Sequence, residues 1–68
     1  MMLHMLSYDK QFRFSFRKYD GRLYVDISGN HRAWIHDIRD GKVYKPQSWV
    51  PADLVEHINR IIRLKAFL

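Results

Sequence analysis

The stretch QFRFSFRKYDGRLYVDIS, residues 11–28, decides the fold, because two runs of alternating apolar and polar residues flank an Asp-Gly pair. Asp20 and Gly21 predict the two-residue loop of a type I′ turn. In that geometry Tyr19 pairs with Arg22, and every later pair along the two strands follows from it. The stretch therefore predicts an antiparallel hairpin whose core face carries Phe14, Phe16, Val25 and Ile27.

The opposite face of this hairpin is basic and aromatic. It presents Arg13, Arg17 and Arg22 together with Tyr19 and Tyr24, and the carboxylate among them is Asp26. Arginine neutralises phosphate, and a tyrosine ring stacks on a base of any identity. The pattern indicates a surface for single-stranded nucleic acid, although a solvated sheet face with ordinary cross-strand pairs is the alternative interpretation.

A second hairpin and a turn continue the sheet. Asp40-Gly41 separates residues 31–39 from residues 42–45 and predicts another two-residue loop, with Arg39 opposite Lys42. Residues 28–30, Ser-Gly-Asn, are expected to join the two hairpins, and residues 45–48 to leave the sheet at a proline. In the second hairpin Trp34, His36 and Ile38 share one face with Val43, while Ala33, Ile35 and Asp37 share the other with Tyr44. The alternation does not tell which of these faces is buried.

A C-terminal helix is expected over residues 51–68. Pro51 suits the first helical turn, and Asp53 and Glu56 place negative charge near its positive end. One stripe at helical spacing carries Leu54, Val55, Ile58, Ile61, Ile62 and Leu68. The chain is therefore expected to be one α+β domain, residues 1–68. It would consist of an apolar N-terminal segment over residues 1–8, an antiparallel four-stranded sheet over residues 11–45, and this helix.

Composition narrows the function. The chain has 68 residues, no cysteine and a formal charge of +5, so it is too short for a deep catalytic cleft and favours an anionic partner. We therefore expect no enzyme activity and no cofactor. We also expect no metal site, since the four histidines lack the spacing of metal ligands. Neither a signal peptide nor an apolar run long enough to span a membrane is visible, and the lack of cysteine favours an intracellular location, cytoplasmic or nucleoid-associated. Trp34 and Trp49 are expected to pack in the core.

Residues 14–27, FSFRKYDGRLYVDI, resemble the first hairpin of the positive transcriptional coactivator family. That family binds single-stranded DNA, has four strands followed by one helix, and dimerises through its helices. Arg17, Tyr19 and Arg22 match the types of residue with which the family contacts DNA. Asp20 departs from the pattern, because the family has a basic residue there, and the family's Lys/Gly-rich stretch before the last strand is absent.

Together these observations predict a protein that binds single-stranded DNA or RNA with low sequence specificity, in transcription or replication. The site is expected to comprise Arg13, Arg17, Tyr19, Arg22 and Tyr24, extended by Lys42 and Lys45. We expect a homodimer. The alternative is a small adaptor or inhibitor of the kind that phages carry, which docks its exposed aromatic residues on an acidic host protein, because Arg, Tyr and Trp also dominate protein interfaces.

Overall fold

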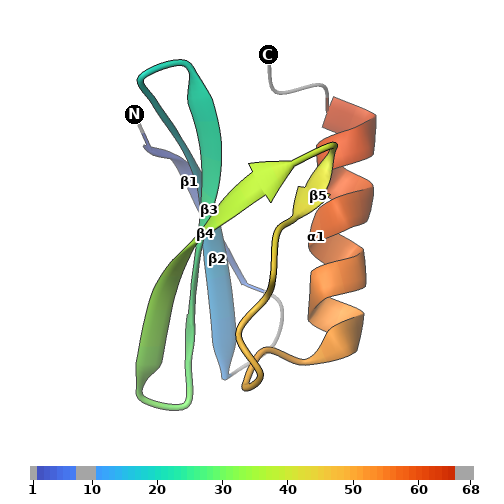
Figure 1. The fold of residues 1–68 in the computed structure, drawn as a ribbon. Coiled ribbons are helices and arrows are strands. Elements are labelled where there is room, and N and C mark those ends of the chain that lie inside the picture. The colour runs from blue at the N-terminus through green and yellow to red at the C-terminus, as the bar shows by residue number, and fades with distance from the viewer. Residues whose placement is uncertain (1, 8–10, 66–68) are drawn as a thin grey trace.

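The computed structural model describes residues 2–7 and 11–65, which form an antiparallel sheet followed by one helix (Figure 1). The strands are β1 (Met2–Ser7), β2 (Phe12–Tyr19), β3 (Arg22–Gly29), β4 (Arg32–Arg39) and the short β5 (Lys42–Val43); the helix is α1 (Ala52–Lys65). The strands lie side by side in chain order, each antiparallel to the next. The predicted α+β fold, with its sheet of two Asp-Gly hairpins and a C-terminal helix, is confirmed.

Both Asp-Gly pairs form the predicted turns. Asp20 and Gly21 have φ angles of 53° and 75°, the left-handed values that a type I′ turn requires at both central positions. Asp40 and Gly41 repeat them at 54° and 77°. The pairs Tyr19 with Arg22 and Arg39 with Lys42 close the two loops, so the register expected from the sequence is the register observed.

The turn between the hairpins lies one residue later than predicted. Asn30 and His31 occupy its two central positions, with φ angles of 53° and 65°, while Gly29 belongs to β3 and pairs with Arg32. Asparagine tolerates the left-handed conformation well, and this lets the turn sit beyond the glycine. Gly29 serves packing instead, because a Cβ there would overlap the carbonyl oxygen of Gln11 and the ring of Phe12.

The N-terminal segment extends the sheet. Residues 2–7 form β1 and pair with β2, with Leu6 opposite Phe14 and Met5 opposite Ser15. An apolar segment was predicted here, but its pairing as an edge strand was not. Residues 1 and 8 of that segment lie outside the described residues.

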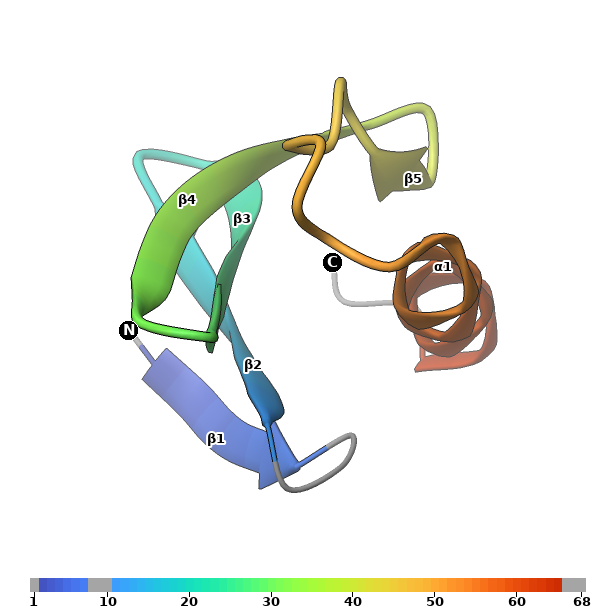
Figure 2. The ribbon, with the colours of Figure 1, turned by 90° about the horizontal axis from the view of Figure 1, so that it is seen from below.

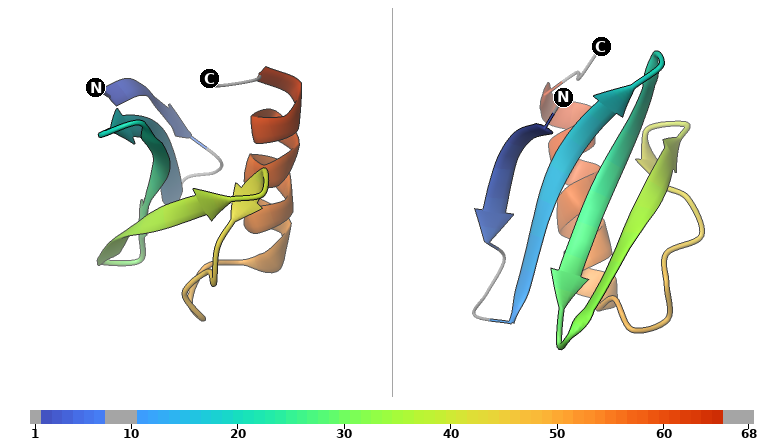
Figure 3. Two further views of the ribbon diagram at one scale, coloured as in Figure 1. Left: turned by 45° about the horizontal axis from the view of Figure 1, so that its top comes forward. Right: turned by 90° about the vertical axis from the view of Figure 1, so that its left-hand side faces the viewer.

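The sheet curls around the helix. Seen from below, the five strands form an arc with α1 on its concave side (Figure 2), and a view from the side shows the sheet in front of the helix (Figure 3). We call the surface turned away from α1 the outer face. A strongly coiled sheet of this kind follows from the right-handed twist of its strands.

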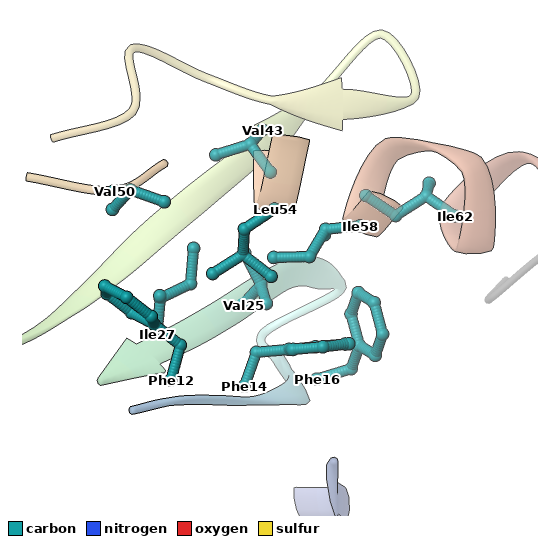
Figure 4. Packing of buried hydrophobic residues seen from close by; sticks show 10 residues of the cluster. All are labelled: Phe12, Phe14, Phe16, Val25, Ile27, Val43, Val50, Leu54, Ile58 and Ile62. Carbon is teal, nitrogen blue, oxygen red and sulfur yellow. The ribbon is translucent and has the colours of Figure 1, made fainter. Parts of the chain in front are cut away.

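The core lies between the concave side of the sheet and one stripe of α1 (Figure 4). Leu54, Ile58 and Ile62 come from the helix, and the half-buried Trp49, Val55 and Ile61 pack against the core cluster. The sheet and the segment before the helix contribute Phe12, Phe14, Phe16, Val25, Ile27, Val43 and Val50. The predicted hairpin core and helical stripe are thus confirmed over the described residues, and Leu68 of the stripe lies outside them.

The second hairpin turns His36, Ile38 and Val43 toward the core, which answers the question that the sequence left open. Trp34 lies opposite Ile27 and so shares this face, yet 56% of its side chain is exposed. The prediction that Trp34 packs in the core is therefore wrong. Figure 2 shows that the start of β4 lies away from α1, so this end of the strand is not covered by the helix.

Two polar side chains hold the second hairpin in place. Asn59 on α1 accepts a 2.8 Å hydrogen bond through Oδ1 from the backbone amide of Val43, which anchors β5 to the helix. The ring of His36 is 2% exposed and bonds on both sides, through Nδ1 to the carbonyl oxygen of Trp34 and through Nε2 to the amide of Gln47. Burial lowers the pKa of His36 below 6.5.

Candidate nucleic-acid interface

The outer face is organised in rows that cross the strands. Arg17, Tyr24 and Asp37 pair in sequence across β2, β3 and β4. The row continues to Tyr44, whose amide donates a 2.9 Å hydrogen bond to the carbonyl oxygen of Asp37. Because side chains directly opposite each other on an antiparallel sheet share a face, these four residues form one line across the outer face.

The first hollow on this face, which we call the Tyr19–Ile35 hollow, has a volume of about 280 Å³. Tyr19 is 72% exposed and Ile35 is 47% exposed, so an aromatic ring and an aliphatic side chain are both accessible from solvent. Two basic residues, Arg17 and Lys18, contribute to the lining. The lining residues are Arg17, Lys18, Tyr19, Tyr24 and Ile35.

A second hollow, the Tyr24–Asp37 hollow, opens where β3 and β4 diverge. The pairing of these strands ends at Tyr24 and Asp37, because β4 then turns to pair with β5. The resulting space of about 470 Å³ is lined by Tyr24 and by an arginine from each strand, Arg22 and Arg39. Its full lining is Gly21, Arg22, Leu23, Tyr24, Asp37, Ile38 and Arg39.

Two carboxylates partly neutralise the positive charge of the outer face. Asp26 lies 3.8 Å from the guanidinium of Arg17, and Asp37 lies 3.3 Å from that of Arg39. Both pairs are partly exposed, so each holds its side chains in place only weakly. The outer face therefore carries two carboxylates, Asp26 from the first hairpin and Asp37 from β4.

No family model matches the chain, and no curated protein or solved structure matches it. The candidate interface accordingly stands on its own geometry, and on the resemblance of residues 14–27 described above.

The structure brings together most of the residues predicted to bind nucleic acid. Arg17, Tyr19 and Tyr24 line the Tyr19–Ile35 hollow, and Tyr24 with Arg22 lines the adjoining Tyr24–Asp37 hollow. Tyr24 lines both hollows, so they are neighbours.

The remaining three predicted residues lie further out. Arg13 pairs with Ser28 and is separated from Arg17 along β2 by the buried Ser15. Lys42 is exposed opposite Arg39, and the ammonium of Lys45 lies 5.3 Å from the ring centroid of Tyr44. Arg13 is thus remote from the hollows, whereas Lys42 and Lys45 extend the basic surface toward β5.

Sequence reasoning missed Arg39, Ile35 and Tyr44 as members of this surface. The guanidinium of Arg39 lies 4.2 Å from the ring centroid of Tyr44, close enough for a cation–π contact. Alternation along residues 33–39 places Ile35, Asp37 and Arg39 on one face, and this pattern was visible in the sequence. It could not show whether that face points outward or toward the core, because this depends on the position of the Asn30-His31 turn.

Among residues 2–7 and 11–65, no three His, Asp or Glu side chains gather in a way that fits a metal ion. The helix in this part of the chain is too short and too polar to cross a membrane.

Proposed function

We propose that the outer face binds single-stranded nucleic acid, DNA or RNA, with little sequence specificity. The observation that carries the proposal is the position of Tyr24, which lines two adjoining hollows, one also lined by Arg17 and the other by Arg22. Tyr24 is half-buried, and an aromatic residue that borders open space between cations suits a polymer that alternates flat bases and phosphates. The resemblance of residues 14–27 to a family that binds single-stranded DNA supports the same function.

In this mechanism the tyrosines hold bases and the cations hold the backbone. Tyr24 and Tyr19 stack on two bases, each at about 1–3 kcal/mol, and a single strand can present its bases in this way because they are not paired. Arg17 and Arg22 neutralise phosphates and release condensed counterions. Lys42 and Lys45 extend the cationic surface toward β5, so that the bound nucleic acid crosses the sheet.

The stacking role of Tyr24 is tested by two substitutions that differ only in the ring. Tyr24→Leu should weaken binding of a labelled single strand about 5- to 150-fold, as expected for the loss of one stacked base. Tyr24→Phe keeps the ring and should bind within about twofold of the unaltered protein. Fluorescence anisotropy measures both. Equal affinity of the leucine variant would exclude Tyr24 as a stacking platform.

A second candidate function is docking on a protein, and one observation favours it. Trp34, Ile35 and Tyr44 are large apolar side chains that lie exposed at the β4 edge, around a hollow of about 250 Å³. Exposed tryptophan and tyrosine are typical of interface hot spots. Under this proposal an acidic host protein would approach the Arg39 and Lys45 side of the sheet.

Two further proposals concern the state of the protein in the cell. Leu64 on α1 is 76% exposed, which supports a homodimer formed through the helices. The absence of cysteine from the sequence supports an intracellular location. Both fit either candidate function.

A further inference from the structure

The Tyr24–Asp37 hollow places an aromatic ring and a carboxylate directly opposite each other. Tyr24 and Asp37 are cross-strand partners on β3 and β4, and both line this space of about 470 Å³. A volume of this size lies within the range of sites for small molecules. A base stacked on Tyr24 here would turn its edge toward the β4 wall of the hollow, where Asp37 lies.

The chemistry of Asp37 distinguishes bases by their edges. An ionised carboxylate only accepts hydrogen bonds. Cytosine, adenine and guanine each carry an exocyclic amino group that donates, and carboxylates accept from it when they read bases. Thymine and uracil carry no amino group, and their one ring N–H lies between two carbonyl oxygens that a carboxylate repels.

Neighbouring arginines make this carboxylate suitable for the task. Arg39 contacts Oδ2 of Asp37 at 3.3 Å, and its guanidinium also lies 4.2 Å from the ring centroid of Tyr44, so a cation stands beside the carboxylate. Arg22 stands at the same hollow from β3. The positive charge of these two side chains offsets the repulsion that Asp37 would otherwise exert on phosphates.

We propose that Asp37 gives the outer face a preference for bases that carry an exocyclic amino group, and that it disfavours runs of thymine or uracil. This inference rests on the proposed function and deepens it: binding remains independent of sequence order but not of base type. Asp37 is a specificity-determining residue in this account, and Tyr24 supplies the stacking.

The test compares single strands of about 20 cytidines and about 20 thymidines, long enough to cover one site of this size. Both are pyrimidines, so their stacking is similar, and slightly alkaline buffer keeps cytosine unprotonated. The unaltered protein should bind the cytidine strand about fivefold more tightly, the lower end of the range for one base contact because Asp37 is partly exposed. In Asp37→Asn, whose amide both donates and accepts, the ratio should fall to about one.

Asp26→Asn is the matched control, since it removes the same charge from the same face. Asp26 contacts Arg17 and is absent from the lining of the Tyr24–Asp37 hollow. The control should raise affinity for both strands alike and keep the ratio near five. A ratio near one in the unaltered protein, or an equal loss of preference in both variants, would overturn the role of Asp37 while leaving the proposed function intact. Failure of both strands to bind would remove the proposed function itself.

Discussion

The backbone amide of Gln47 donates a 3.2 Å hydrogen bond to Nε2 of His36, and this joins the segment after β5 to the buried face of β4. On the other side of the ring, Nδ1 lies 3.1 Å from the carbonyl oxygen of Trp34. These two partners require the neutral tautomer that carries its proton on Nδ1. If Nε2 were protonated, its N–H would face the N–H of Gln47, and two donors cannot form a hydrogen bond. The bond to Gln47 therefore needs an uncharged ring.

Stability should therefore depend on pH through His36. Burial lowers the pKa of His36 in the folded state below its unfolded value of 6.5, so the unfolded chain binds the proton more readily. The free energy of unfolding should be fully maintained above pH 6.5 and should decrease as the pH falls from 6.5 through the lower folded pKa. Urea unfolding at a series of pH values measures this.

The variant His36→Gln should abolish most of this pH dependence, although its overall stability will be lower. The matched control is His31→Asn, because His31 is exposed and asparagine accepts its left-handed conformation. The control should keep the pH dependence of the unaltered protein. A flat pH profile between pH 6.5 and mildly acidic conditions would contradict the structural role of His36.

Gly29→Ala should destabilise the fold. The added methyl group would overlap the carbonyl oxygen of Gln11 and the ring of Phe12, a core residue. Overpacking of this kind costs about 1–3 kcal/mol, and each kcal/mol lowers the Tm of a domain of this size by about 4–8 °C. Thermal unfolding followed by circular dichroism measures the change. The neighbouring Ser28→Ala should stay within about 0.5 kcal/mol, and an equally small effect of Gly29→Ala would show that Phe12 relaxes freely.

Ser15→Ala should leave stability unchanged or raise it. Ser15 is fully buried, and its hydroxyl has no hydrogen-bond partner among the residues that the structure describes. A buried polar group without a partner costs about 1–3 kcal/mol, so its removal can return part of that energy. We expect a gain of up to about 1 kcal/mol in the free energy of unfolding. A loss of similar size would mean that the hydroxyl is hydrogen-bonded in solution.

Arg22→Ala should weaken binding of single strands of every sequence and reduce the slope of log K against log salt by about 0.7, the value for one phosphate contact on a single strand. The matched control is Arg63→Ala, which removes the same charge from an exposed position on α1, away from the outer face. Anisotropy titrations at several salt concentrations compare the two. Identical slopes in both variants would place the phosphate contacts elsewhere.

The local part of this fold could be predicted because turn chemistry and alternation act over few residues. Asp20-Gly21 sets the pairing of β2 with β3, and the pairing alone places Arg17 and Tyr24 side by side. The features that could not be predicted depend on contacts between residues far apart in the sequence. The exposure of Trp34 follows from the curl of the whole sheet, and the outward position of Asp37 and Tyr44 follows from an Asn30-His31 turn that an adjacent glycine obscured.

The central claim is that the outer face binds single strands by charge and stacking. Its most direct test is the fluorescence anisotropy of a labelled single strand of about 20 bases of mixed sequence, titrated with the protein at about 50 and about 200 mM salt, with a duplex of equal length as the control. We predict a Kd in the micromolar range or tighter, preference for the single strand, and steep weakening as salt increases. Absence of binding at the lower salt concentration, or equal binding of the duplex, would contradict the claim.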